Sequence, residues 1–162
     1  MTLYIRQKLF SIGDKFNITD VHGNNIFEVQ GRIFTIGAKL HLFDMQGREL
    51  YYVEQKLFRF LPQYYIYEQG RQCAVVNREF TFFRPRLSVS SSYGDISIDG
   101  DFFSMNFSLF LNGGLIGSIS KEWFSFTDFY RLDIPDGANA AFFCALVIAI
   151  DNCLHNGDQS GR

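Results

Sequence analysis

The chain has 162 residues, enough to bury one sizeable core but too few for two comfortable domains. It is rich in aromatic residues, with 19 Phe and 8 Tyr, and has only 3 Pro, a bias that favours β-structure. The formal net charge of -2 argues against a dedicated nucleic-acid-binding protein, because neutralising phosphates requires a visible excess of Lys and Arg.

Residues 1–134 read as short alternating segments separated by turn residues, the pattern of a β-sandwich or barrel. In the segment DKFNITD, Phe16 and Ile18 alternate with polar residues. Turn glycines recur every 23 or 24 residues, at Gly23, Gly47, Gly70 and Gly94, and further tight turns are predicted at Asp99-Gly100 and Asn112-Gly113-Gly114. The pattern predicts about twelve antiparallel strands, which close into a barrel because closure removes exposed edges.

The pattern changes after Pro135, where a helix is predicted at about 137–154 with Asp136 as its N-cap. A helix apolar on every face must be buried in protein or membrane. The uninterrupted apolar run, 140–150, is well short of the roughly 20 residues that span a bilayer. We therefore expect no transmembrane span and a barrel threaded by its own helix, with a membrane anchor as the alternative. The single domain would cover 1–156, and 157–162 would be a disordered tail.

The sequence offers no motif for catalysis, a metal or a cofactor. Cys73, Cys144 and Cys153 have no CxxC spacing, the three histidines are far apart, and there is no GxSxG elbow or phosphate-binding loop. We therefore expect a non-enzymatic protein, with an enzyme site converging from distant residues as an alternative. The N-terminus lacks the features of a signal peptide, which favours the cytoplasm.

Basic residues are concentrated in one stretch, which suggests a candidate binding surface. Residues 1–86 carry 12 of the 15 basic groups against 8 acids, whereas 87–162 carry 3 against 9. The predicted anion-binding residues are Lys56, Arg59, Arg78, Arg84 and Arg86; the same stretch also contains Arg71. An anionic phospholipid surface or an acidic protein would fit them. The alternatives are solvated strand faces and two oppositely charged halves attracting each other, which would leave a structural or protein-interaction module without a ligand.

Aromatic side chains could form a second surface. Tyr64, Tyr65, Tyr67, Trp123, Phe124 and Phe126 would either form an exposed partner patch or pack the barrel. Packing is the favoured interpretation.

Several segments resemble LURP-one-related proteins, a branch of the tubby C-terminal-like superfamily that also includes phospholipid scramblases. The resemblance is carried by YIRQKLFSIGDKFNITD (4–20), EFTFFRPRLSV (79–89), GDFFSMNFSL (100–109), ISKEWFSFTDFYRLDI (119–134) and ALVIAIDNCLHN (145–156). It implies a twelve-stranded barrel around a central hydrophobic helix. Tubby domains bind phosphoinositide headgroups, but no segment matches a tubby binding motif closely enough to transfer a residue.

Overall fold

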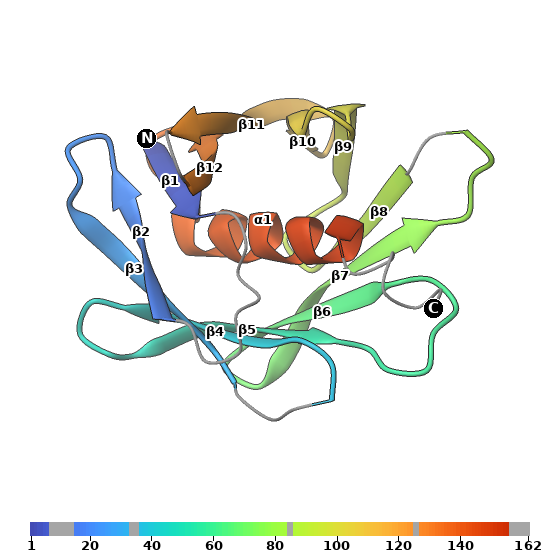
Figure 1. Cartoon of the computed structure of the whole chain (residues 1–162), viewed down its shortest axis with the longest axis horizontal. Coiled ribbons are helices and arrows are strands. Elements are labelled where there is room, and N and C mark those ends of the chain that lie inside the picture. The colour runs from blue at the N-terminus through green and yellow to red at the C-terminus, as the bar shows by residue number, and fades with distance from the viewer. Residues whose placement is uncertain (7–14, 33–35, 84–85, 125–126, 156–162) are drawn as a thin grey trace.

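A closed antiparallel β-barrel surrounds one α-helix in the computed structural model, which describes residues 1–6, 15–32, 36–83, 86–124 and 127–155 (Figure 1). The strands within these ranges are β1 (Thr2–Arg6), β2 (Lys15–Asp20), β3 (Asn25–Gly31), β4 (Lys39–Asp44), β5 (Glu49–Gln55), β6 (Gln63–Glu68), β7 (Arg71–Glu79), β8 (Arg86–Ser91), β9 (Ile96–Asp101), β10 (Asn106–Leu111), β11 (Gly114–Phe124) and β12 (Thr127–Asp133). The helix is α1 (Ala140–His155). The predicted mainly β fold, with about twelve strands and a C-terminal helix, is confirmed.

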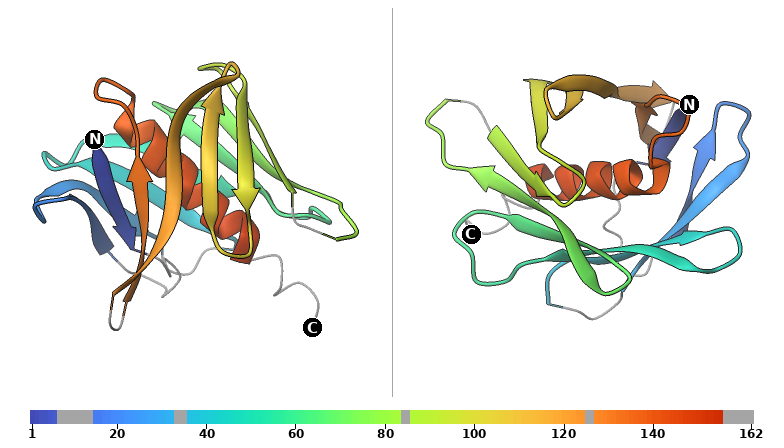
Figure 2. Two further views of the ribbon diagram at one scale, coloured as in Figure 1. Left: turned by 90° about the horizontal axis from the view of Figure 1, so that it is seen from above. Right: turned by 180° about the vertical axis from the view of Figure 1, so that it is seen from behind.

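Each strand pairs with its neighbours in sequence, and β1 closes the barrel against β12 with Leu3 opposite Leu132. The N-terminal amine donates to the Ile134 carbonyl at 2.8 Å, which extends this closure beyond the strands. The seam between β8 and β9 is the weakest pairing among the described residues, because only Val89 and Ile96 face each other there. Figure 2 shows the two strands diverging from this point.

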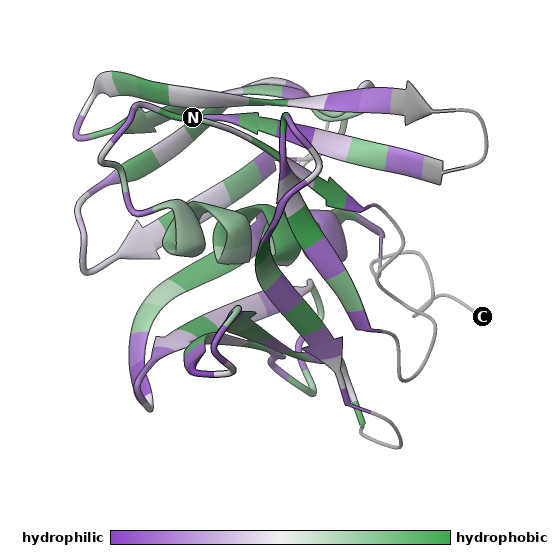
Figure 3. Ribbon diagram, turned by 90° about the vertical axis from the view of Figure 1, so that its left-hand side faces the viewer, coloured by the Kyte–Doolittle hydropathy of each residue, from purple (hydrophilic) through white to green (hydrophobic). Residues whose placement is uncertain are grey.

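The core consists of inward-facing strand residues packed around α1. Successive strand residues point to opposite faces, so buried positions such as Leu40 and Leu42 alternate with more exposed ones. The same alternation appears as green and purple bands along the strands in Figure 3. Every helix residue from Phe142 to Cys153 is buried. Among the residues described, no helix is long and apolar enough to cross a membrane.

Two local predictions are corrected. The helix begins at Ala140 rather than near 137, because the Asn139 side chain, not Asp136, accepts the Phe142 backbone N–H at 3.0 Å. Asp136 instead accepts from the N-terminal amine at 2.9 Å.

Gly100 lies within β9 rather than in a turn. It stands opposite Phe107, where an added Cβ would lie 2.2 Å from the Asn106 carbonyl oxygen. Close approach of two backbones therefore requires glycine here.

Alternate connections of an antiparallel meander lie at opposite ends of the barrel. At one end, here called the turn end, are the β2–β3, β4–β5 and β6–β7 turns and the start of α1 (Figure 1). The predicted turn glycines Gly23, Gly47 and Gly70 have φ of 80°, 83° and 77° there. At the other end, the loop end, are the β5–β6, β7–β8 and β9–β10 connections and the end of α1 (Figures 1 and 2).

Candidate functional site

Two neighbouring connections at the loop end form the candidate site: 56–62 between β5 and β6, and the described residues 80–83 between β7 and β8. The Arg78 N–H donates to the Pro62 carbonyl at 3.0 Å, which joins the end of β7 to the first connection. The Lys56 N–H donates to the Gln63 carbonyl at 2.8 Å, which closes the base of the first connection itself. The Cys153 thiol at the end of α1 lies 3.5 Å from the same Pro62 oxygen. The barrel wall and the central helix therefore both hold the base of the site.

Arg59 and Arg78 line one pocket of about 290 Å³ between the first connection and the end of β7. The other lining residues are Phe60, Leu61, Pro62, Gln63 and Asn77, so no carboxylate of the described residues lines the pocket. The Gln63 side-chain amide donates to the Asn77 side-chain oxygen at 2.6 Å. The pocket is therefore lined by two amide groups as well as by the two arginines. Planar guanidinium donors match the oxygens of phosphate and carboxylate groups, so the pocket suits an anion.

The structure brings the described basic candidates to this end of the barrel. Lys56 begins the first connection, and its ammonium lies 5.5 Å from the centre of the Tyr65 ring. Arg86 begins β8 and stands opposite Glu79. Lys56, Arg59, Arg78 and Arg86 form no ion pair among the residues that the structure describes.

Two further arginines of the basic stretch do not join this cluster. Arg84 lies outside the described residues. Arg71 opens β7 beside the Gly70 turn and therefore lies at the turn end.

Exposed phenylalanines lie in the same two connections, one of them, Phe60, lining the pocket, and the sequence interpretation missed them. Phe58, Phe60, Phe80, Phe82 and Phe83, here called the aromatic rim, are each at least 66% exposed. The signal was available, because the two connections read LFRFLP and FTFFRP, each a short Phe- and Arg-containing run that ends in proline.

Most of the aromatic residues singled out in the sequence lie elsewhere. Tyr64 is buried, as the packing interpretation expected, and Tyr65 and Tyr67 are partly buried. Phe126 and the side chains of Trp123 and Phe124 lie outside the described part of the chain.

A polar network at the turn end anchors the start of α1. Glu68 accepts hydrogen bonds from Tyr51 at 3.1 Å and from Tyr93 at 2.7 Å, and the Asn139 amide donates to Tyr51 at 2.8 Å. Burial raises the pKa of both tyrosines. A pocket of about 280 Å³ lies beside this network, whose hydrogen bonds join the barrel wall to the helix N-cap. The hydrogen-bond network therefore has a structural role.

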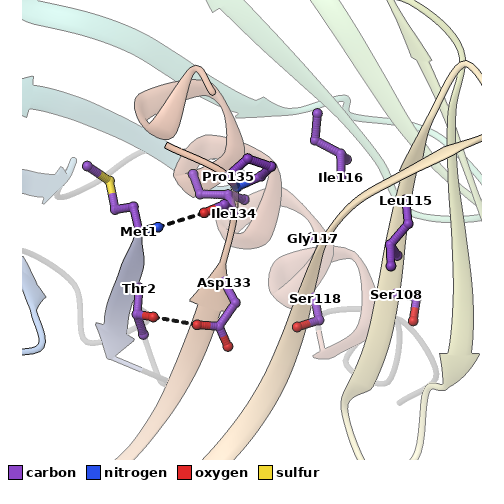
Figure 4. A pocket seen from close by; sticks show the side chains of 10 residues that line it. All are labelled: Met1, Thr2, Ser108, Leu115, Ile116, Gly117, Ser118, Asp133, Ile134 and Pro135. Carbon is purple, nitrogen blue, oxygen red and sulfur yellow. Dashed lines mark hydrogen bonds between the residues drawn. The ribbon is translucent and has the colours of Figure 1, made fainter. Parts of the chain in front are cut away.

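A third hollow, of about 380 Å³, lies over β10, β11 and the end of β12 (Figure 4). The close-up shows the N-terminal amine bonded to the Ile134 carbonyl and Thr2 bonded to Asp133. Arg131 also donates to Asp133, at 2.8 Å. Among the described residues no Lys or Arg lines the hollow, and its carboxylate, Asp133, already has partners, so it differs from the loop-end pocket.

The cysteine thiols are buried. All three cysteines are free and buried, and burial raises the pKa of Cys73 to about 11 and of Cys153 to about 12. Among the described residues, no group of three or more His, Cys, Asp or Glu side chains could hold a metal ion.

Comparison with known proteins identifies the family. The model of the LURP-one-related family matches residues 1–151. The chain belongs to the LURP-one-related family. This LURP-one-related protein is 34% identical over 157 residues to the uncharacterized protein YxjI of Bacillus subtilis (strain 168), covering 97% of this chain and 96% of the relative.

A crystal structure of a protein from Arabidopsis thaliana has the same fold as this LURP-one-related chain. The two superpose with a TM-score of 0.67 at 19% identity, covering 93% of this chain and 89% of the other. The resemblance drawn from the sequence is thus confirmed for the family and the barrel.

Proposed function

We propose that this LURP-one-related barrel is a binding protein, not an enzyme, and that its loop end binds anionic phospholipid headgroups. The observation that carries the proposal is that Arg59 and Arg78, far apart in sequence, line one pocket to which the described part of the chain contributes no carboxylate. A headgroup phosphate would accept hydrogen bonds from both guanidinium groups.

The charges around the pocket favour an approach to an anionic surface with the loop end first. The Lys56 backbone bonds to Gln63, which lines the pocket, and Arg86 begins β8 at the same end of the barrel. A basic residue near an anionic membrane contributes about 1 kcal/mol. The net charge of the whole chain is -2, so the remainder of the molecule is repelled by an anionic surface. The protein would approach such a surface with its loop end first.

The test is sedimentation with phosphatidylserine-containing vesicles of the variant Arg59→Gln/Arg78→Gln. We expect each substitution to weaken binding roughly fivefold, the equivalent of about 1 kcal/mol. The matched control is Arg48→Gln, which removes an exposed arginine from the turn end and should bind like the wild type. Equal binding by all three proteins would contradict the proposal.

A further inference from the structure

The two ends of the barrel differ in their exposed apolar side chains. All six exposed phenylalanines of the described chain, the aromatic rim and Phe103, lie in connections at the loop end. At or near the turn end the exposed large apolar side chains that the structure describes include no phenylalanine; apart from Tyr93, they are the aliphatic residues Met1, Val21, Met45 and Leu115. Apolar side chains exposed together at one end of a soluble protein are typical of a surface that contacts a partner or a membrane.

Packing within the barrel does not account for the aromatic rim. Phe58 is fully exposed although its backbone has φ of 58°, a conformation that is unfavourable for a bulky residue. Phe80 and Phe82 contact each other edge to face, with ring centres 5.4 Å apart, yet both remain exposed. The rings therefore contribute little to the core and are free to contact a membrane or another molecule.

We infer that the aromatic rim inserts into the interfacial and outer acyl region of an anionic bilayer, so that the barrel docks end-on. This inference rests on the proposed headgroup site, and the two share one surface because Phe60 and Arg59 line the same pocket. Phenyl rings have no polar group to keep in water, while the neighbouring arginines would remain at the phosphate level. Charge attraction and ring insertion together attach a protein stably to a membrane, whereas either interaction alone gives only weak, reversible binding.

A second copy of the chain fits this surface less well. A twofold interface places the same patch of each subunit against its partner. The unpaired cations Lys56, Arg59 and Arg86 would then face cations across an apolar contact, which is unfavourable. An anionic bilayer offers both a negative charge for these cations and an apolar interior for the aromatic rim.

The native cysteines permit a direct test of insertion. Because all three thiols are buried, a cysteine introduced by Phe82→Cys can be labelled selectively with an environment-sensitive nitrobenzoxadiazole fluorophore. With phosphatidylserine-containing vesicles we expect a blue shift and quenching by lipids brominated on their acyl chains. The control is Val21→Cys at the turn end, which should show neither. A fluorophore at position 82 that stays in water while the protein is vesicle-bound would overturn the inference.

Removing rings provides an independent readout. Phe58→Asn suits the positive φ, since Asn tolerates this conformation, so the variant should fold at least as well as the wild type. Combined with Phe82→Ser, it should reduce vesicle binding by at least about tenfold, because two apolar side chains no longer leave water. The matched control is Leu115→Ser, which removes an exposed apolar side chain near the turn end without affecting binding. Equal binding by the double variant and the control would contradict insertion.

The outcomes separate the two proposals. Salt-sensitive binding to anionic vesicles with a water-exposed fluorophore at position 82 would support the headgroup site and refute insertion. Equal insertion into neutral and anionic vesicles would support the aromatic rim and refute the headgroup site. Self-association that is lost in Phe58→Asn/Phe82→Ser, without vesicle binding, would refute both and identify a second copy as the partner.

Discussion

Three cysteine thiols are buried inside the barrel, so their rate of alkylation measures whether the barrel stays closed. Burial raises the pKa of Cys73 to about 11 and of Cys153 to about 12, and Cys144 is fully buried within α1. Since only a thiolate reacts readily, we expect almost no alkylation of the native protein at about pH 8. Three alkylations should follow in denaturant, as counted by intact mass spectrometry. Rapid modification without denaturant would show that the barrel opens.

A buried polar contact at the far end of α1 is expected to matter for stability. Tyr130 donates a hydrogen bond to Asp151, which is 1% exposed and whose second carboxylate oxygen has no partner in the described chain. Tyr130→Phe would remove this buried donor, so we expect the free energy of unfolding to fall by about 1–3 kcal/mol in chemical denaturation. Tyr65→Phe, at a partly buried ring, is the control and should be nearly silent. Equal stability of both variants would show that Asp151 does not depend on this bond.

At the scale of elements, α1 is the core of the molecule. Leu146 is completely buried at its centre, so Leu146→Asp would place an unpaired charge inside the barrel. We expect a loss of at least about 4 kcal/mol in unfolding free energy, enough to prevent folding, whereas Leu146→Met should cost less than about 1.5 kcal/mol. Circular dichroism during chemical denaturation measures both. A folded Leu146→Asp variant would contradict the buried position of the helix.

Strands and helix were predictable because their patterns are local. The alternation around Phe16 and Ile18 has the period of a strand, and a helix without a polar stripe can only be buried. Gly100 was placed wrongly because Asp-Gly is also a turn signal, and only the pairing with Phe107 reveals that two backbones approach closely. The start of the helix was predicted too early because Asp136 and Asn139 are both favourable N-cap residues, and the sequence does not show which of them caps the helix.

At the scale of the whole molecule, topology decides which residues meet. The sequence could indicate a basic stretch but could not separate Arg71 from Arg59 and Arg78, because only the order of the connections assigns each residue to an end. The aromatic rim was overlooked for a related reason. Phenylalanines in LFRFLP and FTFFRP have the composition of buried strands, and their exposure depends on lying in two neighbouring connections.

The barrel and the helix are expected to fold as one unit. A chain ending at Pro135 would lack every buried residue of α1, so we expect aggregation or an unfolded circular dichroism spectrum. A chain ending at residue 156 keeps α1 and should elute as the full-length protein does in size-exclusion chromatography. A folded barrel from the shorter chain would show that the wall does not need its helix.

Binding of the purified protein to vesicles with and without phosphatidylserine, at low and at physiological salt, tests the central proposal most directly. We expect binding only to the anionic vesicles, weakened but not abolished by salt, because screening reduces the contribution of Lys56, Arg59, Arg78 and Arg86 while the aromatic rim is unaffected. Absence of binding to either vesicle at low salt would contradict a lipid role for the loop end.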